Sequence, residues 1–87
     1  MTLSLVSVLD TPAATPLRRG LLRLAETAEP IQLDGSAVDR VGTACLQVLS
    51  AGQAAARHAG REFRIADPSP ALVEMATLAG FDDLFAA

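Results

Sequence analysis

Aromatic side chains are nearly missing from this sequence, which contains no tryptophan, no tyrosine and three phenylalanines among 87 residues. A hydrophobic core must therefore be built from leucine, valine, isoleucine and many alanines, which favours helices packed closely on a sheet. The length permits one small domain, residues 1–87, with a single core and no second domain.

Cysteine is also scarce, and the single Cys45 cannot form an internal disulfide. No apolar run approaches the roughly 20 residues that cross a bilayer, so we expect no direct membrane insertion. The start, MTLSLVSVLDTP, lacks the basic region, long apolar run and small-residue cleavage site of a secretory signal. These absences predict a cytoplasmic protein in which Cys45 is a small buried side chain.

Basic residues are few and dispersed. The formal net charge is −3 and the isoelectric point is near 4.8. Binding to a phosphate backbone requires a basic stripe, which singly scattered arginines do not form. We therefore expect no nucleic acid partner.

The residues needed for catalysis or metal binding are missing as well. The only histidine, His58, lies late in a predicted helix, about four turns from Thr43, so no nucleophile has a base within reach. One cysteine, one histidine and the adjacent Asp82 and Asp83 do not make a metal site. Neither GxGxxG nor GxxxxGK[ST] occurs. We expect no catalytic residue, no metal and no cofactor, and hence no enzyme.

Hydrophobic periodicity predicts three strands that alternate with three helices. Thr15 and Ser69 are the expected caps at helix starts, and Gly60 and Gly80 the expected stops. In the last helix, Leu72, Met75, Ala76 and Ala79 are the predicted inward residues. The tail after Phe81 is expected to be frayed or to form a brief helical turn. The strands are expected at 3–9, 31–33 and 61–67, and the helices at 16–29, 43–60 and 70–79. This order predicts an α/β sandwich with a small, mostly parallel sheet.

The helix at 43–60 carries an inward stripe that includes Cys45 and is centred near Gly52. On a helical wheel Thr43 points about 180° away from that centre and Leu46 about 120° away. Leu46 is thus predicted to face water among small and polar residues such as Gln47 and Ser50. It is either a stray exposed side chain or the apolar anchor of a docking face, and spacing alone leaves both readings open.

The segment DGSAVDRVGTACL resembles the signature of STAS domains, small α/β modules in which a pattern close to LSxVxxVDSSGL leads from a strand into the helix that faces partners. The segment REFRIADPSPALVEMATLAGF is similar to the family's next strand, Ser-Pro loop and helix. The resemblance implies a STAS-like sandwich. Only about nine residues precede TPAATPL, so the usual N-terminal hairpin is expected to be shortened to one strand.

The resemblance also implies a site at the start of this helix. Thr43 stands where the family has a phosphorylatable serine, which makes it a phosphoacceptor or a direct partner contact. Gly42 replaces the acidic residue that usually precedes that serine, while Ala44 follows it and Cys45 replaces the usual glycine. The residues expected to bind a partner, alongside Thr43, are Gly42, Ala44, Leu46, Gln47 and Ser50.

The function that the resemblance implies is a non-enzymatic regulatory protein that binds a partner protein, often a GHKL-type ATPase kinase of an anti-sigma switch. The pair Thr43–Ala44 is also similar to the STAS subunit that docks on the ATPase of the bacterial phospholipid-trafficking ABC transporter. Short stand-alone STAS proteins associated with chemotaxis are a third resemblance. The sequence does not choose among these pathways, and homodimerisation through an alanine-rich helix face stays open.

Overall fold

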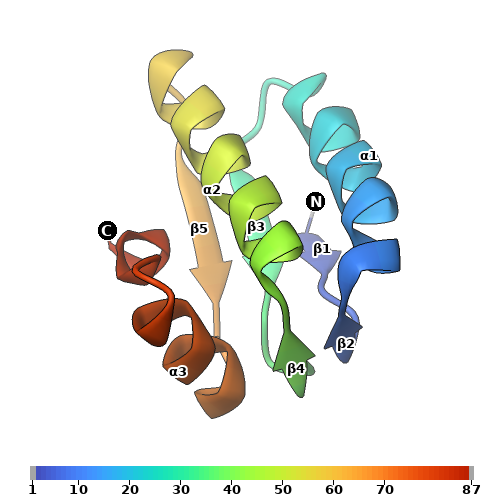
Figure 1. The fold of residues 1–87 in the computed structure, drawn as a ribbon. Coiled ribbons are helices and arrows are strands. Elements are labelled where there is room, and N and C mark those ends of the chain that lie inside the picture. Colours follow the sequence, from blue (N-terminus) through green and yellow to red (C-terminus); the bar gives the residue numbers. More distant parts are fainter. Residues whose placement is uncertain (1, 87) are drawn as a thin grey trace.

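The structure is a computed structural model that describes residues 2–86, and its helices and strands follow one another as an α/β chain (Figure 1). Two short 3-10 helices, η1 at Thr11–Ala13 and η2 at Asp82–Phe85, accompany the longer elements. The strands and α-helices, in chain order, are β1 Thr2–Ser4, β2 Val8–Leu9, α1 Ala14–Ala25, β3 Ile31–Asp34, β4 Arg40–Val41, α2 Thr43–His58, β5 Phe63–Ala66 and α3 Pro70–Leu78.

The main sheet has the strand order β1-β3-β5, and both pairs are parallel. Leu33 of β3 is buried and lies opposite Leu3 and Ile65. The preceding residue of the strand, Gln32, is exposed and lies opposite Thr2 and Arg64. This alternation buries one sheet face and leaves the other in water. Helices α1 and α2 cover the buried face (Figure 1). The predicted α/β, STAS-like sandwich with a small parallel sheet is therefore confirmed.

The N-terminal region differs from the single strand expected at 3–9. The chain leaves the main sheet after Leu5, whose N–H donates to Asp34 O at 2.9 Å, and then forms β2, which pairs in parallel with β4. The Ser7 carbonyl, just before β2, begins this second ladder by accepting the Asp39 N–H at 2.7 Å and the Arg40 N–H at 3.1 Å. Strand β4 lies in a segment for which the sequence analysis expected neither a strand nor a helix, because two residues are too few to carry a recognisable alternation.

Three of the four helix-end signals used in the sequence analysis, Ser69, Gly60 and Gly80, are correct. Ser69 caps α3 by accepting the Leu72 N–H at 3.1 Å, and its hydroxyl donates to the buried Val38 O at 2.5 Å. Gly60 and Gly80 follow their helices with φ of +71° and +82°, the left-handed conformation that glycine adopts without strain.

The predicted bounds of α1 are wrong at both ends. Thr15 is not its cap, because η1 leads directly into α1 at Ala14 and no side chain caps this start. The helix ends at Ala25 rather than at residue 29. The guanidinium of Arg61, at the start of the segment leading into β5, donates to Leu24 O at 3.0 Å, to Ala25 O at 2.7 Å and to Glu29 O. A cation bound to these last carbonyls stabilises the C-terminus of α1.

The C-terminal segment packs more closely than expected. Leu72 and Ala76 are buried as predicted, but Met75 is 43% exposed and Ala79 is also exposed, so these two inward assignments are wrong. The tail forms η2, whose Leu84 is 2% exposed. Leu84 is part of the hydrophobic core. The helix η2 lies beside α2, on the side away from α1 (Figure 1).

Candidate functional site

The side of α2 that faces the core is rotated from the one predicted. Its most deeply buried residues are Cys45 and Leu49 at 0%, Leu46 at 1%, Ala56 at 3% and Gln53 at 5% exposure. The centre of this set lies between Cys45 and Leu46, about 60° around the helix from the predicted centre near Gly52. The residues on the Val48 side of the helix are correspondingly less buried.

Leu46 is therefore not the exposed anchor that the sequence analysis expected. In Figure 1, α3 and η2 lie along the side of α2 opposite α1. Leu46 precedes Gln53 by seven residues, about two helical turns, so both side chains lie on the same side of α2. The Gln53 side-chain amide donates to Asp83 O at 2.8 Å, which joins α2 to η2. A side chain as buried as Leu46 belongs to the core and presents nothing to another molecule.

The other candidate residues do reach the surface. Gly42, Thr43 and Gln47 are exposed, and Ala44 and Ser50 are half-buried. These five residues, here called the α2 face, form the outer side of the first two turns of α2. The α2 face is small and polar, so it can admit a partner closely but supplies little apolar contact of its own.

The start of α2 carries backbone donors that the helix cannot use. Its N-cap is Gly42 in an extended conformation (φ −101°, ψ 170°), and no side chain, that of Thr43 included, caps it. The first intrahelical bond runs from Leu46 N–H to Gly42 O at 3.1 Å. The N–H groups of Thr43, Ala44 and Cys45 therefore have no acceptor within the helix, and they form its partly positive end.

This helix start is fixed in place by two contacts with distant parts of the chain. Gly42 N–H donates to Leu9 O at 2.8 Å, which extends the β2–β4 ladder. The Cys45 thiol donates to Asp10 O at 3.2 Å. Burial, and to a lesser degree the negative charge of Asp10, raises the pKa of Cys45. Cys45 is thus the small, buried, protonated side chain that was expected, and it anchors the first turn.

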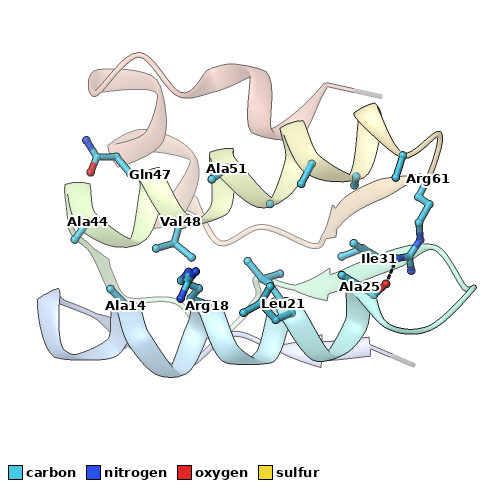
Figure 2. A pocket seen from close by; sticks show the side chains of 15 residues that line it. Ala14, Arg18, Leu21, Ala25, Ile31, Ala44, Gln47, Val48, Ala51 and Arg61 are labelled. Carbon is cyan, nitrogen blue, oxygen red and sulfur yellow. Dashed lines mark hydrogen bonds between the residues drawn. The ribbon is translucent and has the colours of Figure 1, made fainter.

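Two residues of the α2 face also line a groove between α1 and α2. Ala44 and Gln47 lie at one end of it, and Figure 2 shows Ala51 farther along the same helix and Ala14 and Leu21 across from them on α1. The sequence analysis missed this groove. The available signal was the recurrence of alanine at positions 44, 51, 55 and 59, which is a second helical stripe beside the core stripe.

The architecture and this exposed helix start define a small α/β module with a surface, rather than a cavity of reactive groups, as its candidate site. Residues 1–86 match the family model described as Mlab, STAS domain. The chain therefore belongs to the STAS domain family, whose members generally act as regulatory domains through protein–protein interactions. No curated protein matches the chain. None of the helices in the described part of the chain has the length and apolar character to span a bilayer.

Proposed function

We propose that this STAS domain is a cytoplasmic, non-enzymatic regulatory protein that binds a partner protein through the α2 face. The partner favoured by the resemblance is an anti-sigma factor or GHKL-type kinase, or a related signalling protein. Thr43 either contacts the partner or accepts a phosphoryl group from it. Leu46 is withdrawn from this proposal, because it is 1% exposed.

The observation that carries the proposal is the exposure of Thr43 at an uncapped helix start whose position is fixed. The β2–β4 ladder and the Cys45–Asp10 hydrogen bond hold the first turn of α2 in place. A partner can thus meet Thr43 and Gln47 without first ordering them, which lowers the entropic cost of binding. The free N–H groups of this turn offer hydrogen bonds to acceptor groups of the partner.

Phosphorylation of Thr43 would act as an electrostatic switch. The threonine oxygen would attack the terminal phosphorus of ATP held by the kinase, ADP would leave, and the hydroxyl proton would pass to a base of the kinase. The product adds a charge of about −1.5 to −2 at the positive end of α2, where the helix stabilises it and a complementary partner surface is repelled.

The test compares purified variants for binding to the partner captured from the native cell. Thr43→Glu and Gln47→Glu place a carboxylate on the α2 face and should weaken binding at least about tenfold, because it repels the acceptor groups of the partner. Gln32→Glu adds the same charge on the exposed sheet face and serves as the matched control. Equal affinity of all four proteins would remove the α2 face from the proposal.

Phosphorylation of Thr43 is tested separately. Incubation with the captured partner and ATP should add about 80 daltons, the mass of one phosphoryl group, to the wild type and not to Thr43→Ala. Absence of this mass gain, with binding retained, would leave Thr43 only its role as a contact.

A second candidate is a constitutive subunit docked on the ATPase of a phospholipid-trafficking transporter. The observation that favours it is the pair Thr43–Ala44, preceded by Gly42 in place of the usual acidic residue. A permanent subunit should co-purify with the ATPase at fixed stoichiometry through high salt. A switch protein should instead associate in a manner that depends on the nucleotide present.

A further inference from the structure

The groove between α1 and α2 is long enough to accommodate another helix. It runs from Ala14 and Ala44 at one end to Ala59 and Arg61 at the other, with a cavity volume of about 610 Å³ (Figure 2). Ala44 and Ala59 are separated by fifteen residues, which is about 22 Å along α2. A ligand that filled this length would be extended, and a helix of about four turns matches it.

The lining of the groove suits close helix packing. Most residues on the α2 side of the groove are alanine or glycine, and Gln47 and Val48 are the larger ones. Ala44, Ala51, Ala55 and Ala59 are spaced by seven, four and four residues. Small side chains at such positions let a second helix approach closely. On the opposite rim, Leu22 of α1 is 51% exposed and supplies the apolar contact that the alanines do not.

The charged side chains on the two helices that form the groove are all basic. Helices α1 and α2 contain no aspartate or glutamate, although the chain has ten acidic residues and a net charge of −3. Apart from the buried Cys45, their ionisable side chains are Arg18, Arg19, Arg23, Arg57 and His58. The acidic residues lie in the loops, strands, α3 and η2. An overall acidic protein therefore presents a basic helical layer, which attracts an anionic partner.

Within the groove itself, the two charged lining residues are Arg18 and Arg61. Arg61 is bound to the last carbonyls of α1. Arg18 makes no hydrogen bond or ion pair within residues 2–86, and in Figure 2 it extends from α1 on the side that faces α2. Its guanidinium is thus available for a carboxylate brought by a ligand.

We propose that this groove receives an acidic amphipathic helix of the partner protein. The helix lays small and apolar side chains on the alanines of α2 and on Leu22, and a carboxylate at its edge pairs with Arg18. The inference rests on the proposed function and extends it, because Ala44 and Gln47 belong both to the α2 face and to the groove.

The first test uses a defined probe, a blocked peptide of about 15 residues with an alanine and leucine face flanked by glutamates. Its control has lysine in place of each glutamate. We expect the acidic peptide to bind the full chain at least about tenfold more tightly than the basic one, with an affinity that falls as salt rises. If neither peptide binds, or the basic one binds equally well, the proposal is wrong.

Matched variants locate the binding. Ala51→Glu places a carboxylate in the groove and should weaken the acidic peptide at least about tenfold. Ala54→Glu makes the same change at an exposed position of α2 outside the groove. Arg18→Glu is paired in the same way with Arg19→Glu, which lies outside the groove on α1. Equal effects within each pair would mean attraction to overall charge and would overturn the groove assignment, provided circular dichroism shows all four folded.

Further measurements on the same variants and peptide test whether the groove binds something other than a partner helix. Sedimentation of the protein alone should show a monomer, and a dimer dispersed by Ala51→Glu would assign the groove to a second copy of this chain. Displacement of the acidic peptide by laurate at lower concentration would assign it to an amphiphile. Either result overturns the proposal. Binding of the native partner to Thr43→Glu is measured separately, so a failure here is distinguishable from a failure of the α2 face.

Discussion

Thr43 and Leu46 are one helical turn apart on the same side of α2, yet Thr43 is exposed and Leu46 is 1% exposed. Residues three apart on a helix are neighbours on its surface, so the boundary of the core passes between these two side chains. An exposed residue and a core residue thus adjoin each other in the segment that resembles the family's signature. The effect of any substitution in this turn on stability must therefore be measured before its effect on binding is interpreted.

Leu46→Ala should lower the free energy of unfolding by about 2–5 kcal/mol, because it removes a buried side chain and leaves a cavity. Leu22→Ala is the matched control. Leu22 is 51% exposed, and its loss should cost less than about 1 kcal/mol. Urea unfolding of both variants measures the difference. Similar stability of the two would contradict the burial of Leu46.

Ser69→Ala should destabilise the protein by about 1–2 kcal/mol. The substitution removes the cap of α3 and also the hydrogen bond that satisfies the buried Val38 carbonyl. Thr15→Ala is the control, since Thr15 caps nothing. It should change the free energy of unfolding by less than about 0.5 kcal/mol. Both thermal and urea unfolding should show Ser69→Ala to be less stable than Thr15→Ala.

The pKa of Cys45 gives a pH dependence of known sign. Because the folded-state pKa is raised, the unfolded state releases the thiol proton first, near the usual value of about 8.5. Stability should therefore be constant below that pH and fall as pH rises toward the folded-state pKa. The sequence has no lysine and no tyrosine, so Cys45 is the side chain that titrates in this range. Cys45→Ala should show a flat profile between pH 8 and 10, taken as approximate limits.

The thiol should also react slowly. Cys45 is 0% exposed and bound to Asp10 O, so an alkylating reagent reaches it only when α2 opens locally. We expect iodoacetamide to modify the native protein at least about 100-fold more slowly than the urea-unfolded chain at the same pH. Comparable rates would show that the first turn of α2 opens freely, which is incompatible with a preformed α2 face.

Much of this fold follows from local patterns in the sequence. The patterns around Leu33 and Ile65 predicted strands, and the order of strands and helices predicted that they are parallel. Ser69 and Gly60 marked helix ends through their own hydrogen bonds and backbone conformation. These features depend on neighbouring residues. Their prediction needed no knowledge of how the elements pack.

The orientation of α2 could not be predicted in the same way. This helix carries apolar side chains on two sides, with Val48 toward α1 (Figure 2) and Leu46 on the side of Gln53, which binds η2. Periodicity alone does not say which side is buried more deeply. The answer depends on where η2 packs, and that segment was expected to be a frayed tail or a brief turn. The groove was missed for the same reason, because it exists only once α1 and α2 are placed side by side.

The central claim, that the start of α2 is the docking face, is tested most directly by hydrogen–deuterium exchange of the protein with and without its captured partner. The amide hydrogens of Thr43 and Ala44 have no acceptor in the helix, so they should exchange rapidly in the free protein. We predict that the partner slows their exchange at least about tenfold while leaving Gln32 and Arg64, on the exposed sheet face, unchanged. Protection of the sheet face, with rapid exchange retained at Thr43 and Ala44, would contradict the account.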